Sequence, residues 1–356
     1  MADRRARERA LTLVAGSPFS DSGVGTLAGR YADLLEGVGW RTRILAPVGV
    51  AHRENGRQVE QRSYAGLFAE AGDVARSGVR VLVLGLPRER GPAQQAISAL
   101  AQLPRAALLW ERPNTPNSAV GSDLSGLDEL RHVWTLNARH ALTLRRQLPH
   151  ATVSVAPISL PPAFFADTPM PRPVPHPYAV YLGRFADWKG APRLAEVWAD
   201  RVYPRTGTVL LMIGHGLEPG TKGETAVVEI AQRHPERLSL IQTSEITARV
   251  ALLRHADAAI FPGRYEHLPQ ALIEAMAVGV PTVCTAIDGY APVARHRETS
   301  LLIDLDLDGL EAAVVELRDN ASLRASLSAR ARREVQQSFT AQPSTLRLEA
   351  LLDALC

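Results

Sequence analysis

The sequence is poor in cysteine and has no long apolar run. Cys284 and Cys356 are its only two cysteines among 356 residues. Such a low content argues against a disulfide framework or a cysteine-based zinc site and suits a reducing compartment. No stretch approaches the ~20 apolar residues that a membrane span needs, and the run Leu11–Ala15 is too short for a signal-peptide core. We therefore expect a cytoplasmic protein.

Lysine is almost absent as well. Lysine and arginine total 40, yet Lys189 and Lys222 are the only lysines. The net charge is only +3, and the arginines are scattered rather than gathered in a patch interleaved with aromatic residues, so a nucleic-acid-binding function is disfavoured. A lysine at position 189 of such a sequence indicates that a compact point charge is needed there, and chance is the alternative explanation.

Both halves of the chain alternate short apolar segments with amphipathic helices. The length favours two domains, and the alternation predicts parallel sheets with crossover helices. The expected strands of the first half are 11–15, 42–46, 79–84, 106–110, 132–136 and 152–156. Those of the second half are 178–183, 208–213, 237–241, 258–261, 281–287 and 300–303.

A proline-dense stretch separates the two halves. Proline removes backbone donors and disfavours helix before it, which is typical of a linker. We predict two Rossmann-like α/β domains that face each other across a cleft, with ligands at the carboxyl ends of strands. The boundaries are an N-terminal acceptor domain over 1–160, a proline-rich linker over 161–177, a C-terminal donor domain over 178–340 and a terminal helix over 341–356, available to pack back on the N-terminal domain.

The segment from Phe261 to Pro281 has the most informative pattern. The expected strand 258–261 ends at Phe261, and a loop that carries Glu266 follows. A helix then begins near Pro269 and contains Glu274. The free amides and the dipole of a helix start attract anions. Eight residues of chain span on the order of 10–12 Å, enough to hold both ends of a nucleotide-sugar. The alternative is an ordinary loop carboxylate and a solvated helix residue.

A second segment places Arg184 and Lys189 directly after another strand. A guanidinium can fork onto phosphate oxygens, and an ammonium supplies a point charge. With a helix dipole, the two cations could neutralise a diphosphate leaving group without a metal ion. The alternative for Arg184 is a structural ion pair.

These segments resemble those of the retaining family-four glycosyltransferases, which have the GT-B fold. Gly183-Arg184 with Lys189-Gly190 is similar to the donor-diphosphate motif of that family. The pattern from Glu266 through seven residues to Glu274, followed by Ala-Met-Ala and Gly-Val-Pro, is similar to its Glu-x7-Glu signature. The N-terminal likeness is weaker and rests mainly on Gly-Val-Gly at 23–25 before a helix.

The resemblance implies a role for each matching residue. Arg184 and Lys189 would bind the donor diphosphate and stabilise the leaving group. Glu266 would hold sugar hydroxyls near the reacting carbon, and Glu274 would accept hydrogen bonds from the ribose. Backbone amides around Leu268 and Gln270 would meet phosphate or sugar. The full set of further donor-binding positions is Gly23, Gly25, Gly214, His215, His267, Leu268, Pro269 and Gln270.

The resemblance also implies the reaction. A hexosyl group would pass from a UDP- or GDP-sugar to a hydroxyl acceptor, by front-face attack that retains the anomeric configuration. Neither a metal ion nor a cofactor is expected. His267-Leu268-Pro269 stands where relatives often have Gly-Phe-Gly, which leaves the sugar open. On the acceptor side relatives often carry a histidine; here we expect Glu111, Arg112 and Asn114 to serve.

Several alternatives remain open. A nucleotide-sugar epimerase or hydrolase of the same fold, or a non-catalytic sugar- or nucleotide-binding protein, would share these motifs. The G-x-G-x-x-A match at Gly23–Ala28 is weak as a dinucleotide fingerprint, because no acidic residue follows the next strand. The aspartates at 304, 306 and 308 favour a turn over a metal site. The arginines of the helix 322–338 could touch anionic lipid, although a solvated face is favoured.

Overall fold

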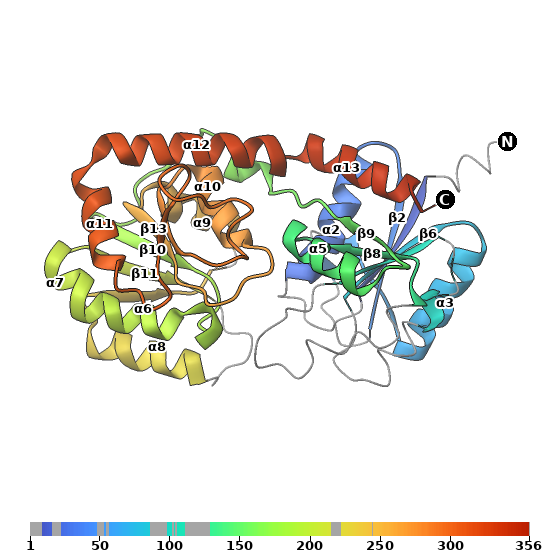
Figure 1. Ribbon diagram of the computed structural model, residues 1–356, viewed down its shortest axis with the longest axis horizontal. Helices are drawn as coiled ribbons and strands as arrows, with labels where there is room; N and C mark the ends of the chain where they lie inside the picture. The colour runs from blue at the N-terminus through green and yellow to red at the C-terminus, as the bar shows by residue number, and fades with distance from the viewer. Residues whose placement is uncertain are drawn as a thin grey trace. The chain divides into compact units, whose positions relative to one another are not determined.

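The chain divides into two compact α/β units, each traced here by itself (Figure 1). The computed structural model describes residues 9–15, 23–47, 53–54, 57–85, 98–101, 103, 105–110, 129–214, 222–243 and 245–355. Unit 1 comprises Met1–Ser159 with Ala341–Cys356, and unit 2 comprises Leu160–Thr340.

Unit 1 is built on a parallel sheet with the strand order β5-β2-β1-β6-β7-β8-β9. Its strands are β1 (Ala10–Ala15), β2 (Arg41–Pro47), β5 (Glu60–Arg62), β6 (Arg80–Leu84), β7 (Ala106–Leu109), β8 (His132–Thr135) and β9 (Thr152–Val155). Helices α2 (Gly23–Glu36), α3 (Tyr64–Arg76) and α5 (Ala138–Gln147) belong to this unit, as does the short hairpin β3–β4 (Arg53–Glu54, Arg57–Gln58). Every residue of β6 and β7 is buried, as expected for central parallel strands.

The last helix, α13 (Ala341–Asp353), belongs to unit 1 although the chain reaches it from unit 2. The buried guanidinium of Arg80 donates from Nε to the carbonyl oxygen of Leu352 at 2.7 Å. It also stacks 5.2 Å from the ring centroid of Trp40, whose indole N–H donates to Glu349 at 2.9 Å. A cation at a helix C-terminus complements the helix dipole, so one arginine fixes the end of α13 to the sheet.

Unit 2 has a six-stranded parallel sheet with the order β12-β11-β10-β13-β14-β15. The strands are β10 (Tyr178–Leu182), β11 (Val209–Ile213), β12 (Leu238–Ile241), β13 (Ala258–Phe261), β14 (Thr282–Thr285) and β15 (Leu301–Ile303). In Figure 1, α6 (Ala191–Val197) and α8 (Lys222–Arg233) lie on one side of this sheet, and α9 (Ile246–Arg254), α10 (Gln270–Val278) and α12 (Ala321–Phe339) on the other. Helix α6 continues through the π-helix η4 (Trp198–Val202) into α7 (Tyr203–Thr206), and α11 (Leu310–Asp319) precedes α12.

The proline-rich segment 161–177 is part of unit 2 rather than a free connection between the units. Its short helix η2 (Pro162–Phe164) buries Phe164 completely. The segment is bound to α9, because the guanidinium of Arg254 donates to the carbonyl oxygens of Ala166 and Thr168. The crossings between units fall at 159–160 and 340–341 instead.

The expected alternation of strands and helices is present in both units, with ends shifted by one or two residues. Strand β5 was not expected, because Glu60–Arg62 is three polar residues at a sheet edge and carries no apolar signal. The aspartates at 304–308 form the expected turn, in which the Asp308 amide donates to the side chain of Asp306 at 3.1 Å.

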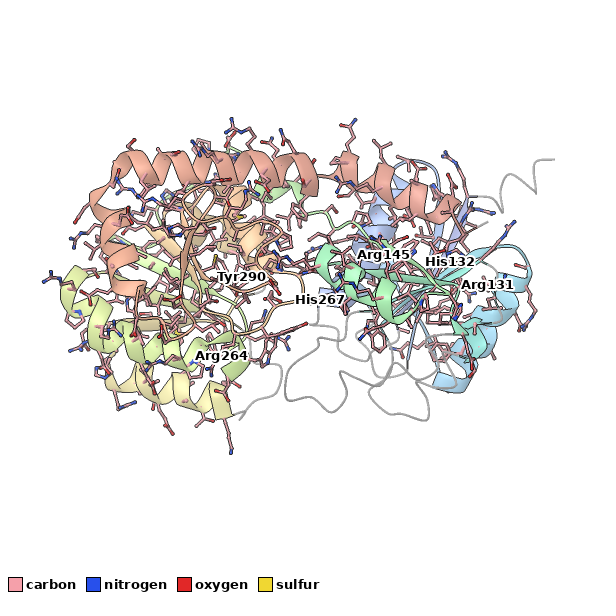
Figure 2. All side chains as sticks on the ribbon, in the orientation of Figure 1. Arg131, His132, Arg145, Arg264, His267 and Tyr290 are labelled. Atoms are coloured by element: carbon pink, nitrogen blue, oxygen red, sulfur yellow. The ribbon has the colours of Figure 1, made fainter. Side chains whose placement is uncertain are left out.

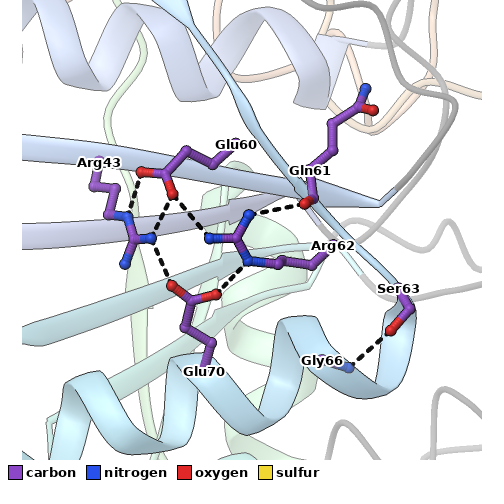
Figure 3. A network of polar contacts seen from close by, with 7 residues as sticks. All are labelled: Arg43, Glu60, Gln61, Arg62, Ser63, Gly66 and Glu70. Atoms are coloured by element: carbon purple, nitrogen blue, oxygen red, sulfur yellow. Dashed lines mark hydrogen bonds and ion pairs between the residues drawn. The ribbon is translucent and has the colours of Figure 1, made fainter.

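An ion-pair network binds the edge strand β5 and helix α3 to β2 (Figure 3). The guanidinium of Arg43 on β2 contacts Glu60 on β5 and Glu70 on α3, both at 2.5 Å. Arg62 bonds the same two carboxylates, reaching Glu70 from Nε at 2.6 Å. Because each carboxylate receives two cations, the network replaces the apolar packing that a polar edge strand cannot supply.

We predict that Glu70→Gln lowers the free energy of unfolding by about 1 kcal/mol at pH 7, the upper range for exposed pairs. Its hydrogen bond with Arg62 lowers the pKa of the Glu70 carboxyl. The ionised form therefore stabilises the fold at neutral pH, and this contribution is lost as the pH falls through the lowered pKa. Urea denaturation at pH 7 and pH 3 measures the difference between variant and wild type.

The matched control is Asp73→Asn, which removes an exposed carboxylate of the same helix from its pair with Arg76. It should change stability by a few tenths of a kcal/mol at most. A Glu70→Gln deficit as large at pH 3 as at pH 7 would show that the charge of Glu70 is not what stabilises this edge.

Candidate functional site

The sequence-predicted cations and carboxylates of unit 2 lie where its strand order reverses. From β10 the chain proceeds to β11 and β12 on one side, then returns to β13 next to β10 and proceeds to β14 and β15 on the other. The loops that leave the carboxyl ends of two such neighbouring strands diverge, and ligands of open α/β sheets bind at this switch point. The loop 183–190 follows β10, and the loop 262–269 follows β13.

Two glycines allow the loops at the switch point to touch backbone to backbone. Gly190 has a left-handed φ of +72°, and a Cβ there would lie 2.1 Å from the carbonyl oxygen of Pro262. A Cβ on Gly289, in the loop after β14, would lie 2.0 Å from the carbonyl oxygen of Glu266. No side chain fits at either position, so glycine is required for the loop 262–269 to sit against both neighbours.

Lys189 and Glu266 come together across these two loops. The ammonium group of Lys189 forms an ion pair with a carboxylate oxygen of Glu266, and both side chains are largely buried. The other oxygen of Glu266 accepts from the amide of His267 at 3.2 Å. A second bond links the loops, because the Arg264 amide donates to the Trp188 carbonyl oxygen at 3.0 Å.

Arg184 and Lys189 share an aromatic neighbour. The Cζ atom of Arg184 lies 4.6 Å from the ring centroid of Trp188, and the Nζ atom of Lys189 lies 4.7 Å from it. A hydrogen bond fixes the backbone of Arg184: the buried hydroxyl of Tyr181, on β10, donates to the carbonyl oxygen of Arg184 at 2.5 Å. The two predicted cations therefore lie in the same loop against the same ring, and Lys189 also pairs with Glu266.

Buried tyrosines and a threonine support the loop that carries Glu266. The pKa of each of Tyr181, Tyr265 and Tyr290 is raised, first by burial and then by the negative charge of Glu266. The hydroxyl of Thr285, at the end of β14, donates to the carbonyl oxygen of Gly263. Tyr290, labelled in Figure 2, is buried, and its hydroxyl lies against Gly263 near the start of the loop.

Glu274 is buried on α10, with 3% of the residue exposed. Its oxygen Oε2 accepts from Nη1 of Arg249, on α9, at 3.0 Å. A buried carboxylate is costly without a partner, and the arginine provides one. The alternative that Glu274 is a solvated helix residue is therefore wrong. Sequence reasoning missed Arg249, because nothing in the pattern of α9 marks it.

The start of α10 differs from the sequence expectation in one respect. Pro269, at φ −83° and ψ 68°, forms the centre of an inverse γ-turn in which the Gln270 amide donates to the Leu268 carbonyl oxygen at 2.9 Å. The Gln270 amide, expected to meet phosphate or sugar, is thus already bonded inside the turn. The helix ends at Gly279, with a left-handed φ of +88°, as expected.

The remaining predicted residues are spread over the chain. Gly214 follows β11, and a Cβ there would lie 2.6 Å from the carbonyl oxygen of Gly183, so its backbone borders the site. Gly23 and Gly25 lie in the first turn of α2, in unit 1. Four predicted residues lie outside the described residues: His215 on the donor side, and Glu111, Arg112 and Asn114 on the acceptor side.

The described part of the chain lacks two features that would point to other kinds of site. It contains no group of three or more His, Cys, Asp or Glu side chains that could hold a metal ion. It also contains no helix with the length and apolar character to cross a membrane.

The arrangement places Lys189 against Glu266 and Arg184 against the same ring as Lys189, with α10 starting after the loop of Glu266 and Glu274 buried further along that helix. Cations and free amides at a helix N-terminus stabilise negative charge that develops on a bound group. A carboxylate on either side can accept hydrogen bonds from hydroxyl groups. The site can therefore bind an anion that carries hydroxylated groups.

Comparison with known proteins identifies the part of the chain that carries this site. Residues 169–334 match the family "Glycosyl transferases group 1". A lipopolysaccharide core biosynthesis glycosyltransferase of Rhizobium meliloti is 29% identical over 175 residues, which are 49% of this chain and 48% of that protein. A 2-deoxystreptamine N-acetyl-D-glucosaminyltransferase of Niallia circulans is 34% identical over 162 residues, 45% of this chain and 41% of that protein. The chain thus spans less than half the length of these curated relatives.

Solved structures match the fold over nearly the whole chain. Sucrose-phosphate synthase from Thermosynechococcus elongatus has a TM-score of 0.75 at 16% identity, covering 98% of this chain and 99% of that one. The Anabaena protein HepE, solved in complex with UDP and glucose, has a TM-score of 0.73 at 14% identity, with 98% and 99% covered. The expected fold class of two Rossmann-like α/β domains is confirmed. Residues 169–334 are therefore similar to the group 1 glycosyl transferases, and the whole chain has the two-domain α/β fold of these solved structures.

Proposed function

We propose that the chain is a retaining glycosyltransferase that moves a hexosyl group from a UDP- or GDP-sugar to a hydroxyl acceptor. The observation that carries the proposal is that Lys189 pairs with Glu266 and shares the Trp188 ring with Arg184 at the switch point of unit 2. Two cations there match the two charges of a diphosphate, and the carboxylate matches a sugar hydroxyl. The relatives' names and the UDP and glucose bound to HepE support a nucleotide-sugar as donor.

Charge stabilisation is the main catalytic term in this proposal. When the bond between the anomeric carbon and the diphosphate breaks, negative charge develops on the leaving oxygen. Arg184, Lys189 and the start of α10 are fixed before the reaction, so they stabilise this charge without reorganising. Two protein cations suffice for this role, so we propose no metal ion and no cofactor.

The acceptor hydroxyl attacks from the face that the diphosphate leaves, and a leaving phosphate oxygen takes its proton. The anomeric configuration is thereby retained. Glu266 orients the donor sugar through its hydroxyls, and Glu274 accepts from the ribose hydroxyls. Acceptor recognition is assigned to Glu111, Arg112 and Asn114, and the low cysteine content favours a cytoplasmic setting.

A screen of donors tests the function directly. Thermal shift with nucleoside diphosphates selects the base, and turnover of the matching sugar nucleotides with candidate acceptors selects the sugar. NMR of the product gives its anomeric configuration. An inverted product contradicts the retaining mechanism, and an altered sugar nucleotide formed without acceptor indicates an epimerase or hydrolase.

Removing either cation should lower turnover strongly. We predict that Arg184→Ala and Lys189→Ala each reduce kcat by ~10²–10³-fold, the usual loss for one preorganised group that stabilises developing charge. Initial rates at saturating donor measure the effect. The control is Arg193→Ala, an exposed arginine on α6, which should keep normal turnover. Near-normal rates in both site variants would contradict the assigned roles.

Replacing Glu274 should weaken nucleotide binding. Glu274→Gln keeps the shape and an acceptor for Arg249 but loses the charge that strengthens hydrogen bonds from ribose hydroxyls. We predict a rise of roughly 10-fold in the Kd for UDP or GDP, whichever binds, from one charged hydrogen bond. Isothermal titration calorimetry measures it, with Glu229→Gln on the exposed face of α8 as control. An unchanged Kd would remove Glu274 from the ribose site.

A further inference from the structure

Trp188 differs from every other tryptophan of the chain. The chain has five tryptophans, and the other four, at 40, 110, 134 and 198, are each at most 4% exposed and belong to the cores. Trp188 is only partly buried and is not a member of the hydrophobic core of unit 2. Core packing therefore does not account for an indole at this position.

The indole of Trp188 instead lies against the two cations of the site. Arg184 Cζ and Lys189 Nζ are 4.6 Å and 4.7 Å from its ring centroid, both inside the ~6 Å range in which an aromatic ring attracts a cation. Tryptophan gives the strongest attraction of the three aromatic side chains. One ring thus contacts both cations, in addition to the ion pair that Lys189 forms with Glu266.

The backbone fixes the position of this ring. Trp188 is the middle residue of the 3₁₀ turn η3 (Asp187–Lys189), which closes with the Gly190 amide bonded to the Asp187 carbonyl oxygen at 2.9 Å. The Trp188 carbonyl oxygen accepts from the Arg264 amide in the opposite loop. The contact between the two loops therefore positions both the backbone of Trp188 and the loop that carries Glu266.

We propose that Trp188 is a positioning residue that holds Arg184 and Lys189 at the spacing of a diphosphate. This inference rests on the proposed function and deepens it. Because the ring attracts both side chains at once, it restricts each to the neighbourhood of the other before the ligand arrives. Two cations held close together favour a diphosphate over a monophosphate, since a diphosphate offers a separate phosphoryl group to each cation and a monophosphate offers only one.

The experiment compares Trp188→Leu, which keeps an apolar side chain, with Trp188→Phe, which keeps a weaker aromatic ring. Calorimetric Kd values for UDP, UMP, GDP and GMP are measured for each. We expect Trp188→Leu to weaken the diphosphate of the preferred base roughly 5- to 20-fold and Trp188→Phe roughly 2- to 4-fold. The monophosphate should change by less than about 2-fold, so the ratio of the two affinities falls in the order Trp, Phe, Leu.

Tyr203→Leu is the matched control, because the Tyr203 ring lies 5.6 Å from the Cζ atom of Arg237 elsewhere in unit 2. It removes a similar cation–ring contact and should leave both affinities unchanged. The fluorescence of wild type gives an independent readout. Trp188 is the one tryptophan not buried, so pyrophosphate should alter the emission of wild type but not that of Trp188→Phe.

The outcomes separate the two proposals. If wild type binds neither nucleoside diphosphates nor pyrophosphate, the proposed function fails and the positioning role falls with it. If wild type prefers diphosphate and Trp188→Leu keeps the same ratio, the positioning role is overturned while the function stands. An equal loss of diphosphate and monophosphate affinity also overturns it, because that result indicates general damage to the loop.

Discussion

The contact on which the site depends is between two stretches of backbone. Gly190 meets the carbonyl group of Pro262 with no room for a Cβ, and this contact brings together the loops that leave β10 and β13. Those strands are adjacent only because the chain returns to the middle of the sheet after β12. Lys189 and Glu266 flank the contact, so their ion pair follows from the strand order and from one left-handed glycine.

The two carboxylates of the site meet different electrostatic conditions. Glu266 lies in a loop between a lysine and its own helix entry, where a ligand hydroxyl and an ammonium can both reach it. Glu274 is inside the unit and depends on Arg249 to offset the cost of a buried charge. A fixed partner keeps its geometry constant, which suits recognition of an invariant group such as a ribose. Glu266 lies in a loop at the switch point, next to the cations of the neighbouring loop, where its charge is balanced by Lys189.

Most of the architecture could be predicted from the sequence, because buried parallel strands are apolar runs bounded by glycine, proline or charge. The site residues of unit 2 could be found for a similar reason: they follow strand ends, where a motif and a helix start coincide. Arg249 could not, since its role depends on α9 packing beside α10, a contact between residues 25 positions apart that no local pattern records. The Gln270 amide was expected to be free for a ligand, because the general preference of proline for the first helical turn does not predict the γ-turn that bonds this amide.

Trp188 shows why a motif alone understates such a site. The pattern Gly-Arg…Lys-Gly specifies charges and turns, but like charges five residues apart in one loop repel each other. An aromatic ring between them in sequence changes that balance, because its attraction to each cation is additive while their repulsion is screened by solvent. The same three residues without the ring would present two independent cations. With the ring the two cations lie against one surface, so each can meet one phosphoryl group of a diphosphate, and a single phosphate offers only one such group.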